Sequence, residues 1–312
     1  MFFEVAGIEV HPIIPPLVAL LISTFTSTGG VSGAFLLLPF QVSVLGFTSP
    51  SVSSTNQLYN IVATPSGVYK YIKEGRMVWP LTWIVVIGTL PGVFLGALIR
   101  INLLSDPTIF KIFAGFVLLY IGIRLIKDVI SKKNNNNNSE TRFQELVKKF
   151  SSHQNNEKIK LPRSSVKKFN LKELVYEFYG ESYTVPTLSM FIISFIVGIA
   201  GGAYGIGGGA IIAPIYIAFY KLPVYTVAGP ALMGTFITSV AGVIFYQLLS
   251  PYYPNLTIAP DWLLGFLFGI GGLVGMYIGA SIQKYIPARI IKWILGFCIL
   301  FLAINYILII FK

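Results

Sequence analysis

The chain has 312 residues, of which 54% are hydrophobic and 11% are charged, and its mean hydropathy is +0.74. This composition is too apolar for a soluble globular protein and is typical of a chain that crosses a membrane several times. The net charge of +11 does not indicate a nucleic-acid-binding protein, because thirteen of the 23 basic residues fall in one polar segment between Arg124 and Lys172. The other basic residues lie near the ends of apolar runs, as they do beside membrane spans.

Apolar segments follow one another along the chain, and they are continuously apolar rather than alternating, so we expect helices and not a transmembrane β-barrel. They cover residues 13–28, 33–46, 52–71, 78–100, 107–130, 185–203, 207–220, 224–249, 260–284 and 288–311. The second and seventh have only about 14 residues and would rise ~21 Å as helices, less than the ~30 Å hydrocarbon core. The sequence therefore predicts an all-α polytopic membrane protein in which these two segments are return arms of re-entrant helical hairpins.

A polar segment, residues 131–183, separates two apolar regions at 1–130 and 184–312. The tract Asn134–Asn138 and the charges around it predict disorder. Near the end of the segment, apolar residues recur at helical spacing opposite lysines: Leu171, Leu174, Val175 and Phe178 opposite Lys167, Lys168 and Lys172. This pattern predicts a helix on the membrane surface, with anionic lipid as a possible partner. A linker helix packed on the protein is an equally good interpretation.

The second apolar region repeats the first. A shift of 175 residues aligns glycines, prolines and tyrosines in order: Gly30 with Gly205, Gly33 with Gly208, Pro39 with Pro214, Gly67 with Gly242 and Tyr71 with Tyr246. After an eight-residue insertion, Gly88, Gly92 and Gly96 align with Gly271, Gly275 and Gly279. Because the series is ordered over the whole half, we interpret it as a duplication of five segments.

Charge predicts that the two halves have opposite orientations. Lys70, Lys73 and Arg76 mark an inside connection, as does the basic segment 131–183, whereas the loop 249–261 has no Lys or Arg and is expected outside. With five segments in each half, the halves become inverted repeats and both termini lie outside the cell. Inverted repeats are the architecture of many secondary transporters, so we expect a multi-pass protein of the cell (plasma) membrane with a cytoplasmic loop at 131–183.

Two glycine-rich stretches, "STGGVSG" (27–33) and "GGAYGIGGG" (201–209), interrupt apolar surroundings. Non-helical backbone survives in a membrane only where it is buried in protein or lines a polar cavity. A short helix is expected to begin at Gly33 and at Gly208, and the free N–H groups at such a helix start suit an anion. Ser27, Thr28 and Ser32 add hydroxyl donors. The alternative is close helix packing by small residues, which we prefer for the four-residue glycine series beginning at Gly88 and Gly271.

A polar stripe follows the first glycine stretch on the segment 52–71. It consists of Ser53, Asn56, Asn60, Thr64 and Gly67, three or four residues apart, and its counterparts are Ala228, Ala231, Thr235, Ser239 and Gly242. We interpret the stripe as a substrate pathway of neutral donors, with interhelical hydrogen bonding as the alternative. None of the twelve acidic residues lies inside a predicted span, which argues against a cation substrate and a proton relay. An anion leaving an inside-negative cell gains ~2.3 kcal/mol per 100 mV, which favours export.

These motifs resemble the TauE/SafE (sulfite exporter, TSUP) family of membrane permeases. The resemblance rests on "GGVSGAFLLLPF" (29–40), "GIGGGAIIAPIY" (205–216), "GVYKYIKEGRMVW" and the later glycine series, and it leaves out the insert 131–183. It implies transport of sulfite, sulfonates and related sulfur-containing or organic anions. It also implies a substrate site between the two glycine stretches and beside Ser54, Thr55, Asn56, Asn60, Thr235 and Ser239. The full set of candidate substrate-binding residues is Ser27, Thr28, Gly30, Ser32, Gly33, Ser54, Thr55, Asn56, Asn60, Gly205, Gly207, Gly208, Gly209, Thr235 and Ser239.

The leading hypothesis is therefore an alternating-access permease for a small anion, namely a sulfur oxyanion, a sulfonate or a carboxylate, with no cofactor, no metal and no nucleic-acid partner. A passive anion channel would use the same residues, and a non-transporting sensor or scaffold would work through the basic loop. An enzyme is not expected, because His11 and His153 lie outside every predicted span and no acidic residue lies inside one. The single cysteine, Cys298, is expected to be a packing residue. An oligomer is compatible with the sequence.

Overall fold

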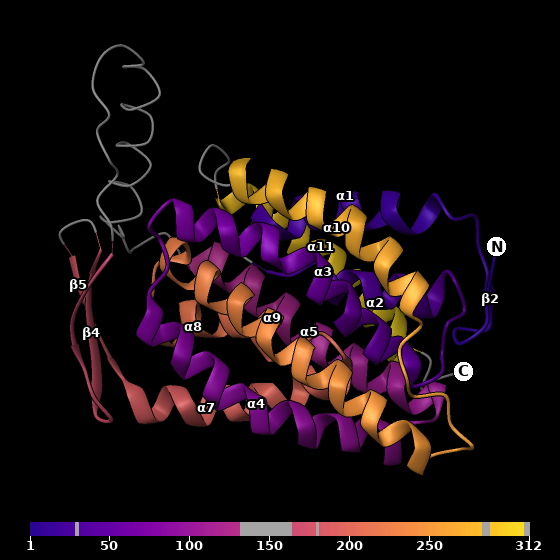
Figure 1. The fold of residues 1–312 in the computed structure, drawn as a ribbon. Helices are drawn as coiled ribbons and strands as arrows, with labels where there is room; N and C mark the ends of the chain where they lie inside the picture. The colour runs from indigo at the N-terminus through magenta and orange to yellow at the C-terminus, as the bar shows by residue number, and fades with distance from the viewer. Residues whose placement is uncertain (29–30, 132–163, 179–180, 283–287, 309–312) are drawn as a thin grey trace.

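The structure is a computed structural model that describes residues 1–28, 31–131, 164–178, 181–282 and 288–308. Its elements are β1 (Phe2–Phe3), β2 (Ile8–Glu9), α1 (Ile14–Thr28), α2 (Ala34–Ser43), α3 (Ser51–Lys73), α4 (Trp79–Asn102), α5 (Pro107–Ser131), β3 (Ser165–Phe169), β4 (Glu173–Phe178), β5 (Glu181–Pro186), α7 (Thr187–Tyr204), η1 (Gly208–Ala210), α8 (Ile212–Tyr220), α9 (Val224–Leu249), η2 (Ser250–Tyr252), α10 (Trp262–Ile282) and α11 (Ala288–Ile307) (Figure 1). Each predicted apolar segment is a helix. Within the described residues, five helices are long and apolar enough to cross a membrane: α4, α5, α7, α9 and α10.

Helix α3 is absent from that group of five although it has 23 residues. Its polar side chains, which lower its hydropathy, face protein rather than lipid: Ser53, Asn56, Gln57, Asn60 and Thr64 are all fully buried. The helix packs against α2, α9 and α10. A polar helix enclosed by apolar helices is the arrangement expected of a transport pathway, because polar groups in a membrane protein face the protein interior or water.

Two short helices follow the glycine-rich stretches. Helix α2 has 10 residues and α8 has 9, so they rise about 15 and 14 Å, too little to cross a ~30 Å hydrocarbon core. Helix α7 ends at Gly205, whose φ of 83° is left-handed, and the N–H groups of Gly205 and Ile206 both donate to the Gly201 carbonyl, at 2.9 and 3.0 Å. Gly207 also has a positive φ, of 76°. The second loop therefore needs glycine for its backbone conformation.

The contacts between the two halves of the chain come in corresponding pairs. Helix α1 packs on α10 and α4 packs on α7, while α3 and α9 pack on each other and α5 packs on α11. The contacts correspond residue by residue, because the aligned glycines press on aligned carbonyl groups. Gly271, Gly275 and Gly279 lie against the carbonyls of Pro16, Leu20 and Thr24, and Gly88, Gly92 and Gly96 lie against those of Phe191, Phe195 and Ile199. These glycines are helix-packing residues, as the sequence indicated.

Replacing Gly92 with alanine is expected to destabilise the α4–α7 pair. The added methyl group would overlap the Phe195 carbonyl oxygen, a backbone atom that cannot rotate away. Overpacking of this kind costs about 1–3 kcal/mol, which should lower the melting temperature of the purified protein in detergent. Leu95→Ala is the control, because Leu95 is 45% exposed on the same helix and should change the melting temperature little. An unchanged melting temperature for Gly92→Ala would contradict the close approach of the two helices.

The predicted surface helix near the end of the insert is wrong, and so is the packed linker helix. Strands β3, β4 and β5 form an antiparallel sheet in that order, with Leu174 opposite Phe169 and Val185. Burial alternates along β4, where Leu174, Tyr176 and Phe178 are buried, which is the period of two of a strand. A spacing of four, as between Leu174 and Phe178, satisfies both a strand and a helix, so the apolar pattern alone did not separate them. The tract Asn134–Asn138 lies outside the described residues.

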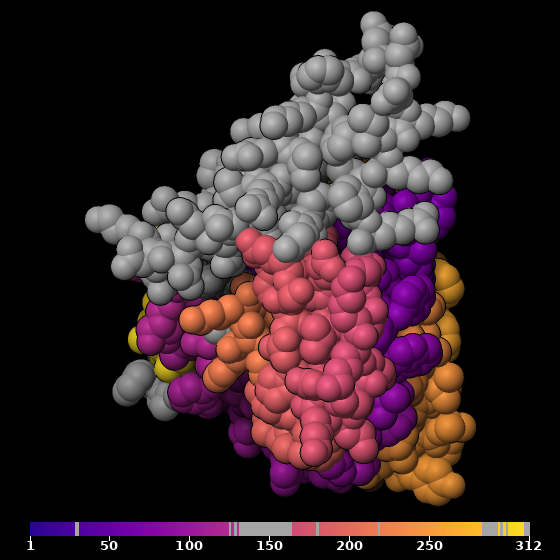
Figure 2. Space-filling view, turned by 90° about the vertical axis from the view of Figure 1, so that its left-hand side faces the viewer, coloured from indigo at the N-terminus to yellow at the C-terminus, as the bar shows by residue number. Residues whose placement is uncertain are grey.

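The sheet covers the end of the helical bundle that carries the connection between α3 and α4 (Figures 1 and 2). The Ser164 hydroxyl donates to the Met77 carbonyl at 3.4 Å, and the hydroxyls of Tyr176 and Thr226 are 2.9 Å apart. Burial raises the pKa of the Tyr176 phenol, so the group stays neutral. The hairpin β1–β2 lies at the opposite end (Figure 1). The described residues 164–178 of the insert and the Lys70–Arg76 connection therefore lie at one end of the molecule.

Candidate substrate site

Two buried asparagines of α3 lie between the two glycine-rich loops. The side-chain nitrogen of Asn56 donates to the carbonyl of Ala34, at the start of α2, at 3.0 Å. The same nitrogen donates to the carbonyl of Gly205, at the end of α7, at 3.1 Å. Its oxygen accepts a hydrogen bond from the Gln41 amide at 3.2 Å. One side chain thus joins the first loop to the second.

Asn60 makes the same kind of link one helical turn further along α3. Its side-chain nitrogen donates to the Ile206 carbonyl of the second loop at 3.0 Å. Its side-chain oxygen accepts a hydrogen bond from the hydroxyl of Ser32 in the first loop. The Ser32 oxygen in turn accepts the Ala34 N–H at 3.2 Å. The structure therefore brings together Ser32, Asn56, Asn60 and Gly205, four residues that the sequence placed in one site.

The second loop also presses against the polar face of α9. The Gly208 N–H donates to the hydroxyl of Thr238 at 3.1 Å. A Cβ atom on Gly207 would lie 2.8 Å from the Ser239 hydroxyl oxygen, and one on Gly209 would overlap the Ala231 carbonyl. The Gly208 amide, which was expected to be free at the start of the short helix, is thus paired with a protein hydroxyl. After this loop the chain forms one 3-10 turn, η1, and helix α8 begins only after that turn.

Hydroxyl groups also surround the first loop. The hydroxyls of Tyr59 and Ser23 are 2.6 Å apart, and a Cβ on Gly33 would lie 2.5 Å from the Tyr59 oxygen. Thr28 donates to the Phe25 carbonyl at 2.5 Å. Ser27 is fully buried, and its hydroxyl has no hydrogen-bond partner among the described residues. Of the predicted residues in this loop, Gly30 lies outside the described part of the chain.

Two predicted site residues, Ser54 and Thr55, lie elsewhere. The Ser54 hydroxyl donates to the Ile258 carbonyl at 2.7 Å, and the Thr55 hydroxyl accepts the Asp261 N–H at 2.8 Å. Both residues therefore hold the loop before α10 rather than the glycine-rich loops. Thr235 is close to Gly209 but donates its hydroxyl proton to the Ala231 carbonyl at 3.0 Å. Its hydroxyl oxygen remains able to accept one more hydrogen bond.

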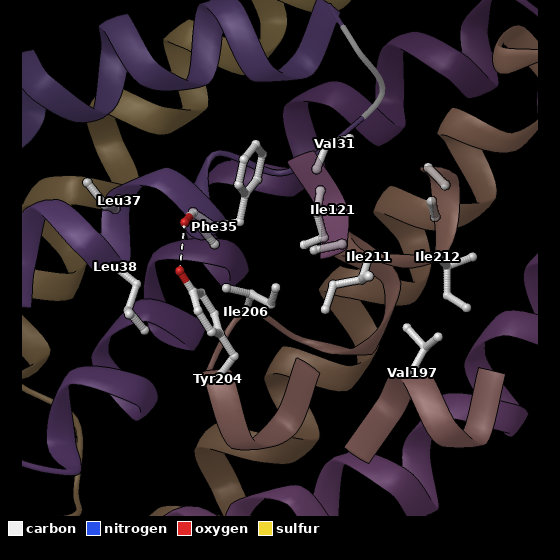
Figure 3. Packing of buried hydrophobic residues seen from close by; sticks show 14 of the residues in the cluster. Val31, Phe35, Leu37, Leu38, Ile121, Val197, Tyr204, Ile206, Ile211 and Ile212 are labelled. Carbon is white, nitrogen blue, oxygen red and sulfur yellow. Dashed lines mark hydrogen bonds between the residues drawn. The ribbon is translucent and has the colours of Figure 1, made fainter. Parts of the chain in front are cut away.

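The opposite face of the loops is apolar. Figure 3 shows Val31, Ile206 and Ile211 packed with Ile121 of α5, all of them buried. The Tyr204 hydroxyl, in the same view, donates to the Phe35 carbonyl at 3.1 Å and adds a further link between the two halves. The loops are thus fixed on one side by apolar packing, and they present backbone polar groups to α3 and α9 on the other.

Sequence reasoning missed four buried polar residues in and near the candidate site. Tyr59, Gln57 and Thr238 are fully or almost fully buried next to predicted positions on α3 and α9, and each could have been found as an extra polar residue in an apolar helix. Arg100 is also fully buried, at the end of α4 away from the Lys70–Arg76 connection. By its position in the sequence Arg100 resembles an ordinary charge that flanks a membrane span. It lies, however, at the end of the bundle where the sequence has few other basic residues.

The candidate site consists of neutral donors and acceptors. In the part of the chain that the structure describes, no group of three or more His, Cys, Asp or Glu side chains gathers to hold a metal ion. Side-chain amides, hydroxyls and backbone dipoles stabilise a small anion without a full opposite charge, which lets the anion leave again. This donor set fits an anion better than a cation.

Replacing Asn60 with leucine, which has a similar shape, is expected to loosen the two loops. The change leaves the Ile206 carbonyl and the Ser32 hydroxyl without their Asn60 partner. A buried polar group left unsatisfied costs about 1–3 kcal/mol, so the melting temperature in detergent should fall. Asn305→Leu is the control, because the exposed Asn305 bonds only within its own helix. Equal melting temperatures for the two variants would show that the link through Asn60 contributes nothing.

Comparison with known proteins identifies relatives along the whole chain. A family model described as the sulfite exporter TauE/SafE matches residues 16–306. The chain is 20% identical over 297 residues to the probable membrane transporter protein YunE of Bacillus subtilis (strain 168), a match that covers 92% of this chain and 94% of that protein. It is 26% identical over 103 residues, 33% of this chain and 39% of the relative, to the probable membrane transporter protein YdhB of the same organism. No solved structure matches the chain significantly.

Proposed function

Because the chain belongs to the TauE/SafE sulfite exporter family of membrane transporters, we propose that it carries small sulfur-containing or organic anions, such as sulfite or sulfonates, across the cell membrane. The observation that carries this proposal is the pair Asn56 and Asn60, which joins the two glycine-rich loops into one buried, neutral donor site. The substrate class follows from the donors and from the absence of acidic side chains among the residues that line this site.

The proposal includes an inverted arrangement of the two halves, which would allow alternating access. The correspondence of contacts between the halves extends to a pair of contacts between α3 and α9. Gln57 lies against Gly242, and its counterpart under the 175-residue shift, Leu232, lies against Gly67, where a Cβ would be 3.1 Å from the leucine methyl group. Two copies in such reciprocal contact can exchange roles at the two membrane faces, which is how inverted repeats produce alternating access. We include the re-entrant character of α1–α2 and α7–α8 in the proposal.

Burial of the site favours a carrier over an open channel. Ser32, Asn56, Asn60 and Ser239 are all fully buried, so a substrate reaches them only if helices move. Tyr71 and its counterpart Tyr246, both fully buried, lie near opposite ends of the α3–α9 pair. A site enclosed in this way requires a conformational step in each transport cycle.

Flux measurements test the proposal. Purified protein in proteoliposomes is expected to carry at least one of sulfite, sulfate, thiosulfate, sulfoacetate and taurine with saturable kinetics, and an internal anion should accelerate uptake of the labelled one. Liposomes without protein are the control. Flux that never saturates would favour a passive channel, and the absence of flux for all five compounds would contradict the substrate class.

The orientation is proposed from charge. The Lys70–Arg76 connection and residues 164–178 of the insert lie at one end of the bundle, which should be the cytoplasmic end, and both termini should lie outside. Single cysteines introduced at Gly46 and Lys221, after replacement of Cys298 by alanine, should be labelled from opposite faces of the membrane. Labelling of both positions from one face would overturn the inverted arrangement.

A further inference from the structure

Arg100 is a buried cation without a carboxylate partner among the described residues. Its Nε donates to the Ser53 hydroxyl at 3.2 Å, and the guanidinium lies 3.8 Å from the centre of the Phe110 ring. Its Nη1 donates to the Leu104 carbonyl, and its Nη2 contacts the carbonyls of Thr48 and Ser49 at 3.5 and 3.4 Å, which is long for a hydrogen bond. Burying a charge costs several kcal/mol unless it is compensated. Every one of these partners is neutral, so no opposite charge among the described residues offsets the guanidinium, and its positive charge remains available to attract an anion.

Three side chains on the facing sides of α3 and α9 carry buried polar atoms without a hydrogen-bond partner in the described part of the chain. They are Gln57, with both amide atoms, Ser239 and Tyr246, with their hydroxyls. All three side chains are fully buried. Buried polar groups are almost always hydrogen-bonded, and the exceptions in native proteins call for an explanation by a ligand, an ion or water.

The unpartnered polar side chains follow one another along α9 and α3, from the second glycine-rich loop toward the end of α4 that carries Arg100. Ser239 lies against Gly207, and the next turn of α9 brings Gly242 against the Gln57 amide. Gln57 is one turn along α3 from Ser53, which accepts the hydrogen bond from Arg100. This line of side chains therefore joins the candidate site to the guanidinium.

Tyr246 completes the far end of this line. It lies one turn beyond Gly242 on α9 and packs with Ala97 and Ile101, the residues that flank Arg100 on α4. The unpartnered hydroxyl and the unneutralised cation thus share one region at the end of the bundle opposite the Lys70–Arg76 connection.

We propose that Arg100, with Gln57 and Tyr246, forms a second anion subsite, which receives a small oxyanion at one end of the pathway and passes it to the glycine-rich loops. The proposal rests on the proposed function and adds a charged binding step to a site otherwise built from neutral donors. The guanidinium supplies the attraction that neutral groups lack, and the Gln57 amide and the Tyr246 hydroxyl supply donors toward the loops. Discrimination of anions from neutral solutes takes place at this subsite.

Binding of sulfite to the purified full-length protein tests the subsite through the ligand-dependent shift in melting temperature at constant ionic strength. Arg100→Gln is expected to raise the apparent Kd at least tenfold, and Arg100→Lys, which keeps the charge but loses the same carbonyl contacts, should raise it clearly less. Tyr246→Phe removes only an unpartnered hydroxyl and should raise it about threefold while the protein stays folded. The control is Arg76→Gln, because Arg76 is a buried arginine paired with Glu74 and should leave the Kd within twofold.

The outcomes separate the subsite from the proposed function. If the wild-type protein binds neither sulfite nor the other four anions, the proposed function fails, and the subsite fails with it. If the wild-type protein binds sulfite and both Arg100→Gln and Tyr246→Phe bind it equally well, only the subsite is overturned. Equal losses in Arg100→Gln and Arg100→Lys would also overturn it, since they would assign Arg100 to holding the loop carbonyls. Should Arg100→Gln fail to fold, the result for Tyr246→Phe decides.

Discussion

Replacing Gly208 with leucine is expected to abolish anion flux while the amount of protein in the membrane stays unchanged. A Cβ on Gly208 would overlap the Cβ of Thr89 on α4 and lie 2.8 Å from its hydroxyl oxygen. The η1 turn must then move away from α4, and the hydrogen bond from the Gly208 N–H to Thr238 is lost. Insertion depends on the apolar helices, which the change does not touch. The measurement is flux in proteoliposomes, normalised to the protein in the membrane fraction.

A double substitution at Gly208 and Thr89 tests whether the loss of flux results from the steric overlap between these two residues. The three atoms nearest to the added Cβ all belong to the Thr89 side chain. Gly208→Ala alone should lower flux at least tenfold, whereas Gly208→Ala together with Thr89→Gly should restore a substantial part of it. Thr89→Gly alone measures the cost of glycine in a helix, about 1 kcal/mol. Wild-type flux in Gly208→Leu would refute the role of the second loop in transport.

Replacing Gln57 with leucine is expected to make the protein more stable and a poorer transporter. Both amide atoms of Gln57 are buried without a partner in the described part of the chain, and such groups cost about 1–3 kcal/mol. Leucine fits this position, because Leu232 occupies the corresponding place opposite Gly67 in the other half. The melting temperature should therefore rise by several degrees, while flux falls at least tenfold because the pathway loses a donor.

The mirror substitution, Leu232→Gln, is the matched control for this prediction. It places an amide in the apolar cluster that Leu232 shares with Val68 and Ala228, and it should lower the melting temperature. A Gln57→Leu variant that is less stable than wild type and keeps full flux would show that the amide is satisfied within the protein and has no part in transport.

Hydropathy was sufficient to predict the helices other than α3, because each of them is an apolar run bounded by loops. The segment predicted at 224–249 has the bounds of α9, and the segment predicted at 13–28 differs from α1 by one residue. The repeat also predicted which glycines press on a neighbouring helix, since Gly92 and Gly275 occupy equivalent contacts. These features could be predicted because hydropathy depends only on the local sequence and because the glycine pattern occurs in both halves of the chain.

The sequence did not predict features that depend on a partner distant along the chain. Ser54 and Thr55 have the same chemistry as the residues beside the loops, and only the position of the 258–261 segment shows that they hold a different part of the fold. Arg100 is an ordinary flanking charge by position, and its burial results from Ser53, Phe110 and the 48–49 carbonyls meeting around it. The sheet was missed because Leu174 and Phe178 fit two periods equally well.

The glycine contacts also determine which parts of the molecule are able to shift as rigid blocks. Helix α4 is locked to α7, and α1 to α10, with backbone so close to backbone that neither helix of a pair slides without the other. Each locked pair takes one member from each half of the chain. In the proposed transport cycle, each block that moves would therefore combine helices from both halves of the chain, and an isolated half would expose two glycine-lined grooves that its partner helices normally fill.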